Sequence, residues 1–353
     1  MVRRNIVIGH EELSRFIGDA LKAKGASAAD AAVVAEGLVW ANLRGVDGHG
    51  VSRLPLYLKM IERGEIDPRA RPRLVGDRAA TFTLDGGRGF GPVAMMQAIA
   101  IAAERARNFG VSLALVCRTT HTGAIGRYAQ WLAERGCAAL LMVAGPAFVA
   151  YHGARVASMG TNPIAIAVPG GGGPVVLDMA TSTISNGKIL QALAAGATLP
   201  SGTVLTGEGE PTTDPRLAEI LLPLGGPKGS GLALMFEMLA SVLAAAPIQA
   251  TALGPEKRRR LTQNCTIFAV DIATFRPVAD FAKDADALAA ILSGLPRQAG
   301  FDEILLPGER AARTEAKRRK SGIPIPRKVW EELAEIVAAH AIAPLTPLAA
   351  PAK

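Results

Sequence analysis

Hydrophobic residues near the N-terminus recur at the spacing of a helix. The first stripe, with members three or four positions apart, consists of Leu13, Phe16, Ile17, Ala20 and Leu21. Such spacing predicts an amphipathic helix. A second stripe follows residues 27–30, a Ser-x-x-Asp pattern typical of a helix N-terminus, and it consists of Ala31, Val34, Ala35, Leu38 and Val39. The pattern therefore predicts two N-terminal helices, followed by a loop over residues 44–55.

Beyond residue 90, helical and strand-like patterns alternate. Helices are predicted at residues 93–107 and 124–135, each followed by an apolar run typical of a buried strand, at residues 111–117 and 137–144. Further strands are predicted at residues 164–168, 175–177 and 266–272, a Gly-rich loop at 170–173 and a mobile excursion at 244–260. Alternation of this kind favours an α/β fold, with a mixed sheet covered by helices.

Composition places the chain among globular proteins. Its 353 residues, 49% of them hydrophobic, suffice for one large domain or two to three smaller ones. The longest apolar run, residues 231–246, contains Glu237 and falls short of the roughly 20 residues that span a bilayer. It predicts a core helix. Because residues 1–10 also lack the apolar stretch of a signal peptide, we expect a cytoplasmic protein without a membrane segment.

The net charge of +8 raises the question of a nucleic-acid partner. The basic clusters at residues 257–260 and 317–320 are predicted to lie in polar connections, without interleaved aromatic residues or a zinc-finger pattern. Solvated loops that attract anionic substrates are the favoured interpretation. The three cysteines, Cys117, Cys137 and Cys265, lack the spacing of metal ligands, which predicts a reduced compartment and no metal site.

Glycine-rich segments supply one candidate binding site. No Gly-x-Gly-x-x-Gly lies between a strand and a helix, so a Rossmann nucleotide-binding unit is not predicted. Residues 225–231 place glycines and Lys228 before a helix, where backbone N–H groups and a positive charge can hold a phosphate. An ordinary helix start has the same composition, so both interpretations stay open.

Two histidines and one aspartate occupy positions suited to chemistry. His49 lies between two glycines that leave its imidazole accessible, as a general acid requires. His121 follows a predicted strand and precedes a helix, where α/β sheets often bind ligands. Asp178 follows the predicted strand at 175–177 and precedes hydroxyl side chains. Solvated or capping roles are the alternatives for all three residues, and these roles are also the ones assigned to His10, His152 and His340.

Taken together, these motifs resemble the type-2 malate/L-lactate dehydrogenase family. The resemblance spans nearly the whole chain, and its signatures fall in order at residues 46–57, 121–123, 160–164, 177–182, 186–188, 224–232 and 306–309. It implies a non-Rossmann α/β fold and a homodimer. It also implies an NAD- or NADP-dependent oxidoreductase that interconverts a small 2-hydroxy acid and its 2-oxo acid, or reduces a cyclic imino acid.

The resemblance also implies roles for single residues. His49 matches the proton donor, Arg53 the residue that clamps the substrate carboxylate, and His121 a second acid/base histidine. The positions that match cofactor contacts are Asp178, Met179, Ala180, Thr181, Ser182, Lys228, Gly308, Glu309 and Arg310. The physical chemistry agrees, because an alkoxide formed at C2 needs a proton and an Arg fork suits a carboxylate.

The chain departs from the family pattern at Gly48, where many members carry a serine whose hydroxyl assists the histidine. A non-catalytic nucleotide- or anion-binding homologue is therefore the alternative function. The substrate, the choice between NAD and NADP, and the preferred direction stay open. We expect residues 1–75, with the catalytic loop, to pack with residues 310–353, and residues 76–309 to form the cofactor- and substrate-binding core.

Overall fold

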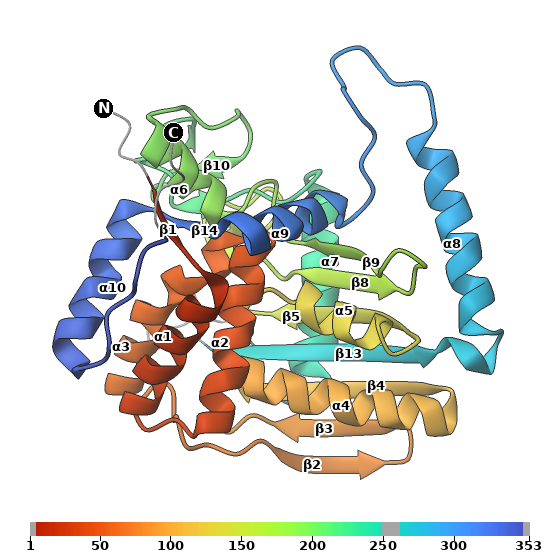
Figure 1. Ribbon diagram of the computed structural model, residues 1–353. Helices are drawn as coiled ribbons and strands as arrows, with labels where there is room; N and C mark the ends of the chain where they lie inside the picture. The colour runs from red at the N-terminus through yellow and green to blue at the C-terminus, as the bar shows by residue number, and fades with distance from the viewer. Residues whose placement is uncertain (1–4, 249–261, 349–353) are drawn as a thin grey trace.

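The computed structural model describes residues 5–248 and 262–348, and its main layer is a seven-stranded sheet (Figure 1). The strands, in spatial order, are β2 (Arg73–Arg78), β3 (Thr81–Asp85), β4 (Val111–Thr119), β13 (Gln263–Asp271), β5 (Cys137–Ala144), β8 (Ile164–Val168) and β9 (Val175–Met179). β3 and β4 pair in parallel, and all other neighbours are antiparallel. The predicted mixed sheet is confirmed.

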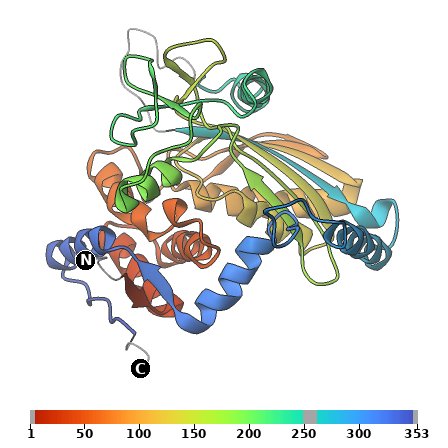
Figure 2. The same cartoon turned by 90° about the horizontal axis from the view of Figure 1, so that it is seen from above.

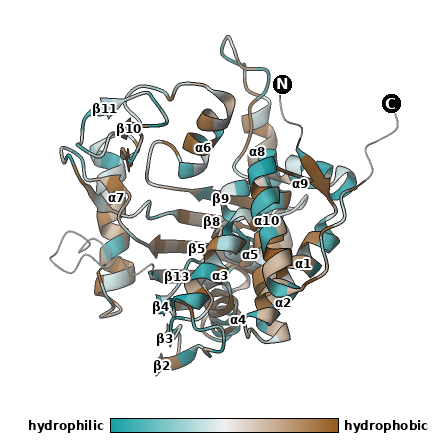
Figure 3. Cartoon of the chain, turned by 90° about the vertical axis from the view of Figure 1, so that its left-hand side faces the viewer, coloured by the Kyte–Doolittle hydropathy of each residue, from teal (hydrophilic) through white to brown (hydrophobic). Residues whose placement is uncertain are grey.

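Helices cover both faces of this sheet because its strands alternate between two environments. On β13, Cys265, Ile267 and Ala269 belong to the hydrophobic core shared with α4 (Gly91–Phe109) and α5 (Gly126–Ala133). The other face packs against α7 (Pro227–Glu237) and the π-helical turn η3 (Met238–Val242). There Thr266 Oγ1 donates to the Leu239 carbonyl at 2.8 Å. Figure 3 shows the central strands β5 and β8 as predominantly hydrophobic.

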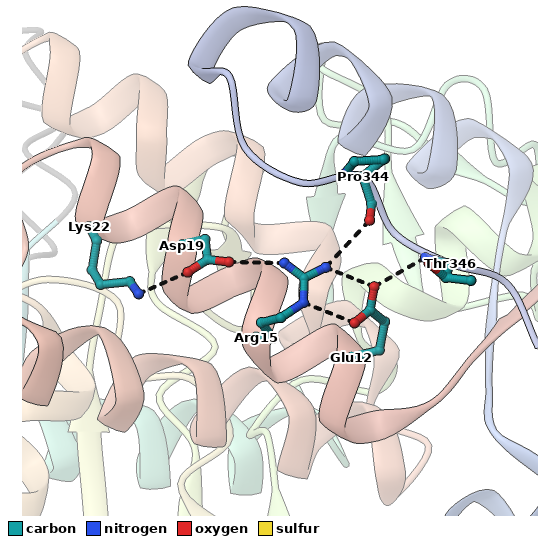
Figure 4. A network of polar contacts seen from close by, with 6 residues as sticks. All are labelled: Glu12, Arg15, Asp19, Lys22, Pro344 and Thr346. Carbon is teal, nitrogen blue, oxygen red and sulfur yellow. Dashed lines mark hydrogen bonds and ion pairs between the residues drawn. The ribbon is translucent and has the colours of Figure 1, made fainter.

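The two ends of the chain share a second core. It joins α1 (His10–Ala23), α2 (Ala28–Leu43) and α3 (Leu54–Glu62) to β14 (Ile323–Ile325) and α10 (Arg327–His340), while β1 (Ile6–Ile8) pairs with β14. A polar network adds to this contact (Figure 4). Arg15 binds Glu12 and the Pro344 carbonyl, and Glu12 accepts from the Thr346 N–H at 3.2 Å. The C-terminal segment is thereby tied to α1.

The remaining elements form a small sheet and two outlying helices. The small sheet consists of β11 (Pro211–Thr212), β10 (Val204–Leu205), β12 (Ile220–Leu221), β6 (Val149–Ala150) and β7 (Ala157–Met159), and α6 (Asn186–Ala195) packs beside it. α8 (Val278–Ser293) follows the short turn η5 (Ile272–Thr274) and lies at the end of the main sheet away from the N-terminal helices (Figure 2). α9 (Glu309–Ser321) returns the chain to α2.

Most predicted elements are confirmed within a few residues, and two predictions are wrong. Residues 231–246 do not form a core helix, because only one side of α7 and η3 faces the sheet. Leu232 and Met235, on the other side, are 43% and 50% exposed. The basic residues 317–320 lie in α9 and not in a connection, since strongly charged sequences can also form solvated helices. The basic cluster at 257–260, and most of the excursion predicted at 244–260, lie outside the described residues.

Within the described ranges, no helix is both long and apolar enough to cross a membrane.

Candidate active site

The loop that carries His49 is held by a buried asparagine. Between α2 and α3 the chain forms two short 3₁₀ turns, η1 (Asp47–His49) and η2 (Val51–Arg53). Asn42, at the end of α2, donates from Nδ2 to Asp47 Oδ1 and accepts from the Val51 N–H, both at 2.7 Å. A Cβ at Gly50 would overlap the Asn42 amide, so this close approach requires glycine. The loop is therefore well fixed relative to α2.

Three aromatic side chains line up beside this loop. His49 Nδ1 lies 3.1 Å from His121 Nε2, and the two rings are parallel within 3°. The other nitrogen of His121, Nδ1, lies 2.6 Å from the Tyr57 hydroxyl, which is buried in α3. The structure thus brings the two predicted histidines together and adds Tyr57, which our sequence analysis missed. Its position at the end of the 46–57 signature, eight residues after His49, is the signal that could have identified it.

Protein packed around these groups determines their charge. Burial, reinforced by the positive charge of Arg53, lowers the pKa of His49 to about 4. Burial and the charges of His49 and Arg53 bring the pKa of His121 well below its usual value. Burial raises the pKa of Tyr57. Both imidazoles are therefore neutral at pH 7 while the phenol keeps its proton, so each of the three groups can donate or accept a hydrogen bond.

Arg53 is anchored through one edge of its guanidinium. Its Nε donates to the Gly48 carbonyl at 2.6 Å. No carboxylate of the described residues forms an ion pair with it. The two Nη groups are the part of the fork that a substrate carboxylate can bind.

Asp178 lies within β9, and its carboxylate forms a hydrogen bond with the start of the helix that follows His121. Oδ2 accepts a hydrogen bond from the N–H of Gly126, the first residue of α5, at 2.7 Å. Asp178 therefore contacts the start of α5 from a strand distant in sequence, and it is not itself a helix N-cap, which was the alternative that the sequence left open. Neighbouring protein atoms raise the pKa of the Asp178 carboxyl to about 6 by desolvation, although the residue as a whole is exposed to solvent. Asp178 thus joins the predicted cofactor stretch to the His121 loop.

In the rest of that stretch, the hydroxyl side chains form hydrogen bonds with backbone carbonyls. Thr181 Oγ1 donates to the Thr161 carbonyl at 2.9 Å, and Ser182 Oγ donates to the Ile184 carbonyl at 2.8 Å. Met179, which ends β9, and Ala180 are partly exposed. Thr181 and Ser182 are buried, at 1% and 6% exposure, so Met179 and Ala180 are the accessible part of these four residues.

Two glycine-containing turns flank this stretch. Gly308, with φ +83°, starts α9 and lies against β9, where a Cβ would come within 2.7 Å of the Val176 carbonyl. Glu309 reaches back to the segment before α9, with Oε2 accepting from the Leu306 N–H at 3.1 Å, while Arg310 is exposed. The late predicted segment therefore lies beside the predicted strand end.

On the other side, the Thr181 carbonyl accepts from the Leu224 N–H at 2.8 Å, immediately before the turn that begins α7. Gly225 and Gly226 in this turn both have positive φ, and Lys228 is exposed in the first helical turn. The imidazole of His152 lies against Gly226. No hydrogen bond within the described part of the chain joins Lys228 to the histidine pair.

A surface therefore runs from Gly308 along the end of β9 to Lys228. Among the described residues, it combines a helix N-terminus that no side chain caps with the exposed Lys228, which forms no ion pair there, and these donors fit the phosphates of a dinucleotide. A separate groove of about 630 Å³ lies over α1 and α2, and none of the predicted site residues lines it.

Comparison with known proteins identifies the family of the chain. The sequence model described as malate/L-lactate dehydrogenase matches residues 8–334. The L-sulfolactate dehydrogenase of Methanocaldococcus jannaschii is 34% identical over 336 residues, covering 94% of this chain and 96% of that protein. A Δ1-pyrroline-2-carboxylate/Δ1-piperideine-2-carboxylate reductase of Pseudomonas putida is 36% identical over 236 residues, covering 66% of this chain and 69% of that protein.

Similarity extends to three-dimensional structure. The malate dehydrogenase of Entamoeba histolytica superimposes with a TM-score of 0.91 at 27% identity, covering 96% of this chain and 99% of that one. Relatives named as hydroxy-acid dehydrogenases and imino-acid reductases make this protein a 2-hydroxy acid oxidoreductase, a class that uses a nicotinamide cofactor. The chain belongs to the malate/L-lactate dehydrogenase family.

Proposed function

We propose that this protein is an NAD(P)-dependent enzyme that transfers a hydride between nicotinamide and C2 of a small 2-hydroxy or 2-oxo acid, or of a cyclic imino acid. The observation that carries the proposal is the alignment of His49, His121 and Tyr57 beside Arg53. This cluster supplies both a proton and a carboxylate clamp, which are the two functions that the reaction needs from the protein.

Arg53 positions the substrate. With Nε occupied by the Gly48 carbonyl, the guanidinium presents its Nη groups to the C1 carboxylate, and two hydrogen bonds fix the orientation of C2. A bound nicotinamide supplies the hydride in reduction and accepts it in oxidation. The substrate oxygen on C2 then exchanges a proton with His49 Nε2, the ring nitrogen that His121 leaves free.

The hydrogen-bonded row of side chains can serve both directions. When His49 is an imidazolium, its Nδ1 donates to His121 Nε2, His121 Nδ1 donates to Tyr57, and His49 Nε2 gives its proton to the alkoxide in reduction, which leaves His49 neutral. When His49 is neutral, its Nδ1 still donates to His121 and its Nε2 is bare, so it takes the hydroxyl proton in oxidation and becomes the imidazolium. The same geometry thus offers an acid or a base through the protonation state of His49.

We assign cofactor binding to the surface described above. Asp178, Met179, Ala180, Thr181 and Ser182 form its centre. Lys228 and its helix N-terminus face the phosphates, and Gly308, Glu309 and Arg310 close the other side. The mostly antiparallel main sheet supports binding without a Rossmann unit. We further propose that the protein works as a homodimer.

Two measurements test this function. Fluorescence titration with NADH and NADPH is expected to give saturable binding of at least one cofactor. Purified protein is expected to consume that cofactor with a member of a panel of 2-oxo and cyclic imino acids. Saturable binding without turnover on any substrate would favour the non-catalytic homologue that Gly48 suggests. Folded protein that binds neither cofactor would rule out the proposed enzyme and leave an anion-binding homologue as the alternative.

A further inference from the structure

Helix α9 connects the two halves of the proposed site. Its first residues, from Glu309, belong to the proposed cofactor surface, whereas its last turns lie over the loop that carries His49. From these turns Arg318 reaches Asp47, with Nη1 to Oδ1 at 2.7 Å and Nη2 to Oδ2 at 3.1 Å. This two-pronged ion pair lies two residues before His49.

Asp47 and Arg318 also share a partner in α2. Arg318 Nη1 donates to the Asn42 carbonyl, and the Asn42 side chain donates to Asp47 Oδ1. Since Asn42 also accepts from the Val51 N–H, both 3₁₀ turns of the loop are connected to the same network. A shift of Arg318 would therefore reach the loop on both sides of His49.

A second contact joins α9 to α2 nearer the cofactor surface. Arg44 Nη1 forms an ion pair with Glu315 at 3.0 Å, and Nη2 approaches the Gly308 carbonyl at 3.5 Å. Arg44 is also close enough to Asp178 to oppose the burial that raises the pKa of that carboxyl. The C-terminal end of α2 thus touches the cofactor surface through Arg44 and the catalytic loop through Asn42.

Burial separates these two ion pairs from the other ion pairs of α9. The side chains of Arg44 and Arg318 are 8% and 15% exposed, whereas Arg313 and Arg319 are more than half exposed. Ion pairs exposed to solvent have little energetic effect. The Arg318–Asp47 pair is better shielded from solvent on its arginine side and has two hydrogen bonds, so it fixes the position of α9 relative to the loop.

We propose that Arg318 is a positioning residue that couples cofactor binding to the placement of His49. Cofactor held against Gly308 fixes the start of α9, and Arg318 at its other end then holds Asp47 and the loop in the geometry that binds substrate. The inference rests on the proposed function. It predicts that cofactor and substrate each strengthen the binding of the other, because both stabilise the same arrangement of α9 and the loop.

The test measures that coupling directly. NADH, or NADPH where that is the bound form, is titrated calorimetrically with and without saturating oxalate, an unreactive analogue of a 2-oxo acid. In the unaltered protein, we expect oxalate to tighten cofactor binding by a factor within the usual range of about 5- to 150-fold. In Arg318→Gln, we expect that factor to fall to within about twofold of unity, while the Kd for cofactor alone changes less than about threefold.

Matched variants separate positioning from general damage. Lys320→Gln removes the same charge from the last turn of α9, where the side chain is exposed, and is expected to keep the full coupling. Arg318→Lys retains the charge but loses the two-pronged pair, and we expect intermediate coupling with unchanged thermal stability. A variant that only loosened the fold would lower thermal stability and weaken the binding of both cofactor and oxalate. It would leave unchanged the factor by which oxalate tightens cofactor binding.

The outcomes are distinct. Coupling that persists in Arg318→Gln, or that is absent from the unaltered protein although cofactor binds, overturns the role of Arg318 and leaves the proposed function standing. If the unaltered protein binds no cofactor, the proposed function fails, and this inference fails with it.

Discussion

His49 is held neutral mainly by the protein that encloses it, with Arg53 acting in the same direction. A substrate carboxylate bound at Arg53 offsets that positive charge, and an alkoxide forming at C2 favours the protonated imidazole further. The side chain is therefore a base in the free protein and becomes an acid as negative charge accumulates beside it. Its chemistry is controlled by the substrate as much as by the fold.

The first prediction concerns the pH dependence of oxidation. Since the pKa of His49 is lowered to about 4, its base form is present above that pH and is lost as pH falls through it. We expect kcat/KM for a 2-hydroxy acid to stay level from pH 8 to about 5 and to decline below. Initial-rate measurements in constant ionic strength check this. A decline centred near pH 6.5 would mean that burial does not control this histidine.

The same shift affects stability. A histidine in the unfolded chain has a pKa near 6.5, whereas the pKa of His49 in the folded protein is about 4. Between these values the unfolded state binds more protons, so the free energy of unfolding decreases as pH falls. Melting curves at pH 7 and pH 5 should therefore differ more for the unaltered protein than for His49→Asn.

The second prediction separates the roles of the site residues. His49→Ala is expected to lower kcat by roughly 10²- to 10⁴-fold, with cofactor affinity nearly unchanged. Arg53→Lys is expected to raise KM roughly 10- to 150-fold, because one charge-assisted hydrogen bond is worth roughly 1.5–3 kcal/mol. Steady-state kinetics and cofactor titration distinguish them. Near-normal kcat in His49→Ala together with loss of turnover in His121→Ala would move the acid/base role to His121.

Tyr57 gives the third prediction. Tyr57→Phe keeps the buried ring and removes only the hydroxyl that contacts His121 Nδ1. Losing one buried hydrogen bond is expected to lower kcat roughly 3- to 10-fold, because the tautomers of the histidine pair are no longer fixed at that end. The pH profile should shift while KM for substrate stays the same. Unchanged kcat and an unchanged profile would confine Tyr57 to a packing role.

At the scale of elements, the sequence pattern predicted those helices and strands whose bounds depend on neighbouring residues in the chain. The bounds of β5 and β8 were predicted residue for residue, because both are short, continuous apolar runs of the kind that form buried strands. The N-cap at Ser27 is confirmed, with its Oγ accepting from the Asp30 N–H at 3.1 Å. The π-helical end of α7 was not predicted, since its contact with Thr266 joins residues 27 positions apart.

The catalytic loop shows the same limit. The glycines beside His49 suggested accessibility, but the sequence carries no sign that Gly50 lies against Asn42 or that Asp47 pairs with Arg318, 271 positions away. Pairing of His49 with His121 was likewise not predicted, although each residue was a candidate. Single residue types indicated the chemistry, and only the fold could say which of them meet.

The fourth prediction tests how the loop is built. Gly50→Ala places a methyl group against the Asn42 amide, so we expect a loss of about 1–3 kcal/mol in the free energy of unfolding and a marked loss of activity. Gly48→Ala is the matched control, because the nearest atom to its Cβ would be Gly187 Cα at an ordinary 3.8 Å. Denaturant titration of both variants decides. Equal stability of the two would mean that the loop adapts easily.

At the scale of the whole molecule, two helices present hydrophobic residues that the described part of the chain leaves uncovered. α8 has no buried residue, and Leu288 and Ile291 on it are 58% and 64% exposed. Leu232 and Met235 form part of a similar stripe on α7. Contiguous apolar surface of this kind marks an interaction site, and a symmetric pair of copies is the commonest way to cover it. This surface supports the proposed homodimer.

The last prediction asks which helix makes that contact. If α8 forms the interface, Leu288→Ser combined with Ile291→Ser should convert a dimer into a monomer at micromolar concentration, because two large apolar contacts are lost on each side of a two-fold axis. Light scattering measures the mass. Lys283→Ser, a change at an exposed polar position of the same helix, should leave the dimer intact. A dimer that survives the double α8 variant but dissociates in Leu232→Ser with Met235→Ser would place the interface on α7. An unaltered protein that is a fully active monomer would refute the homodimer itself.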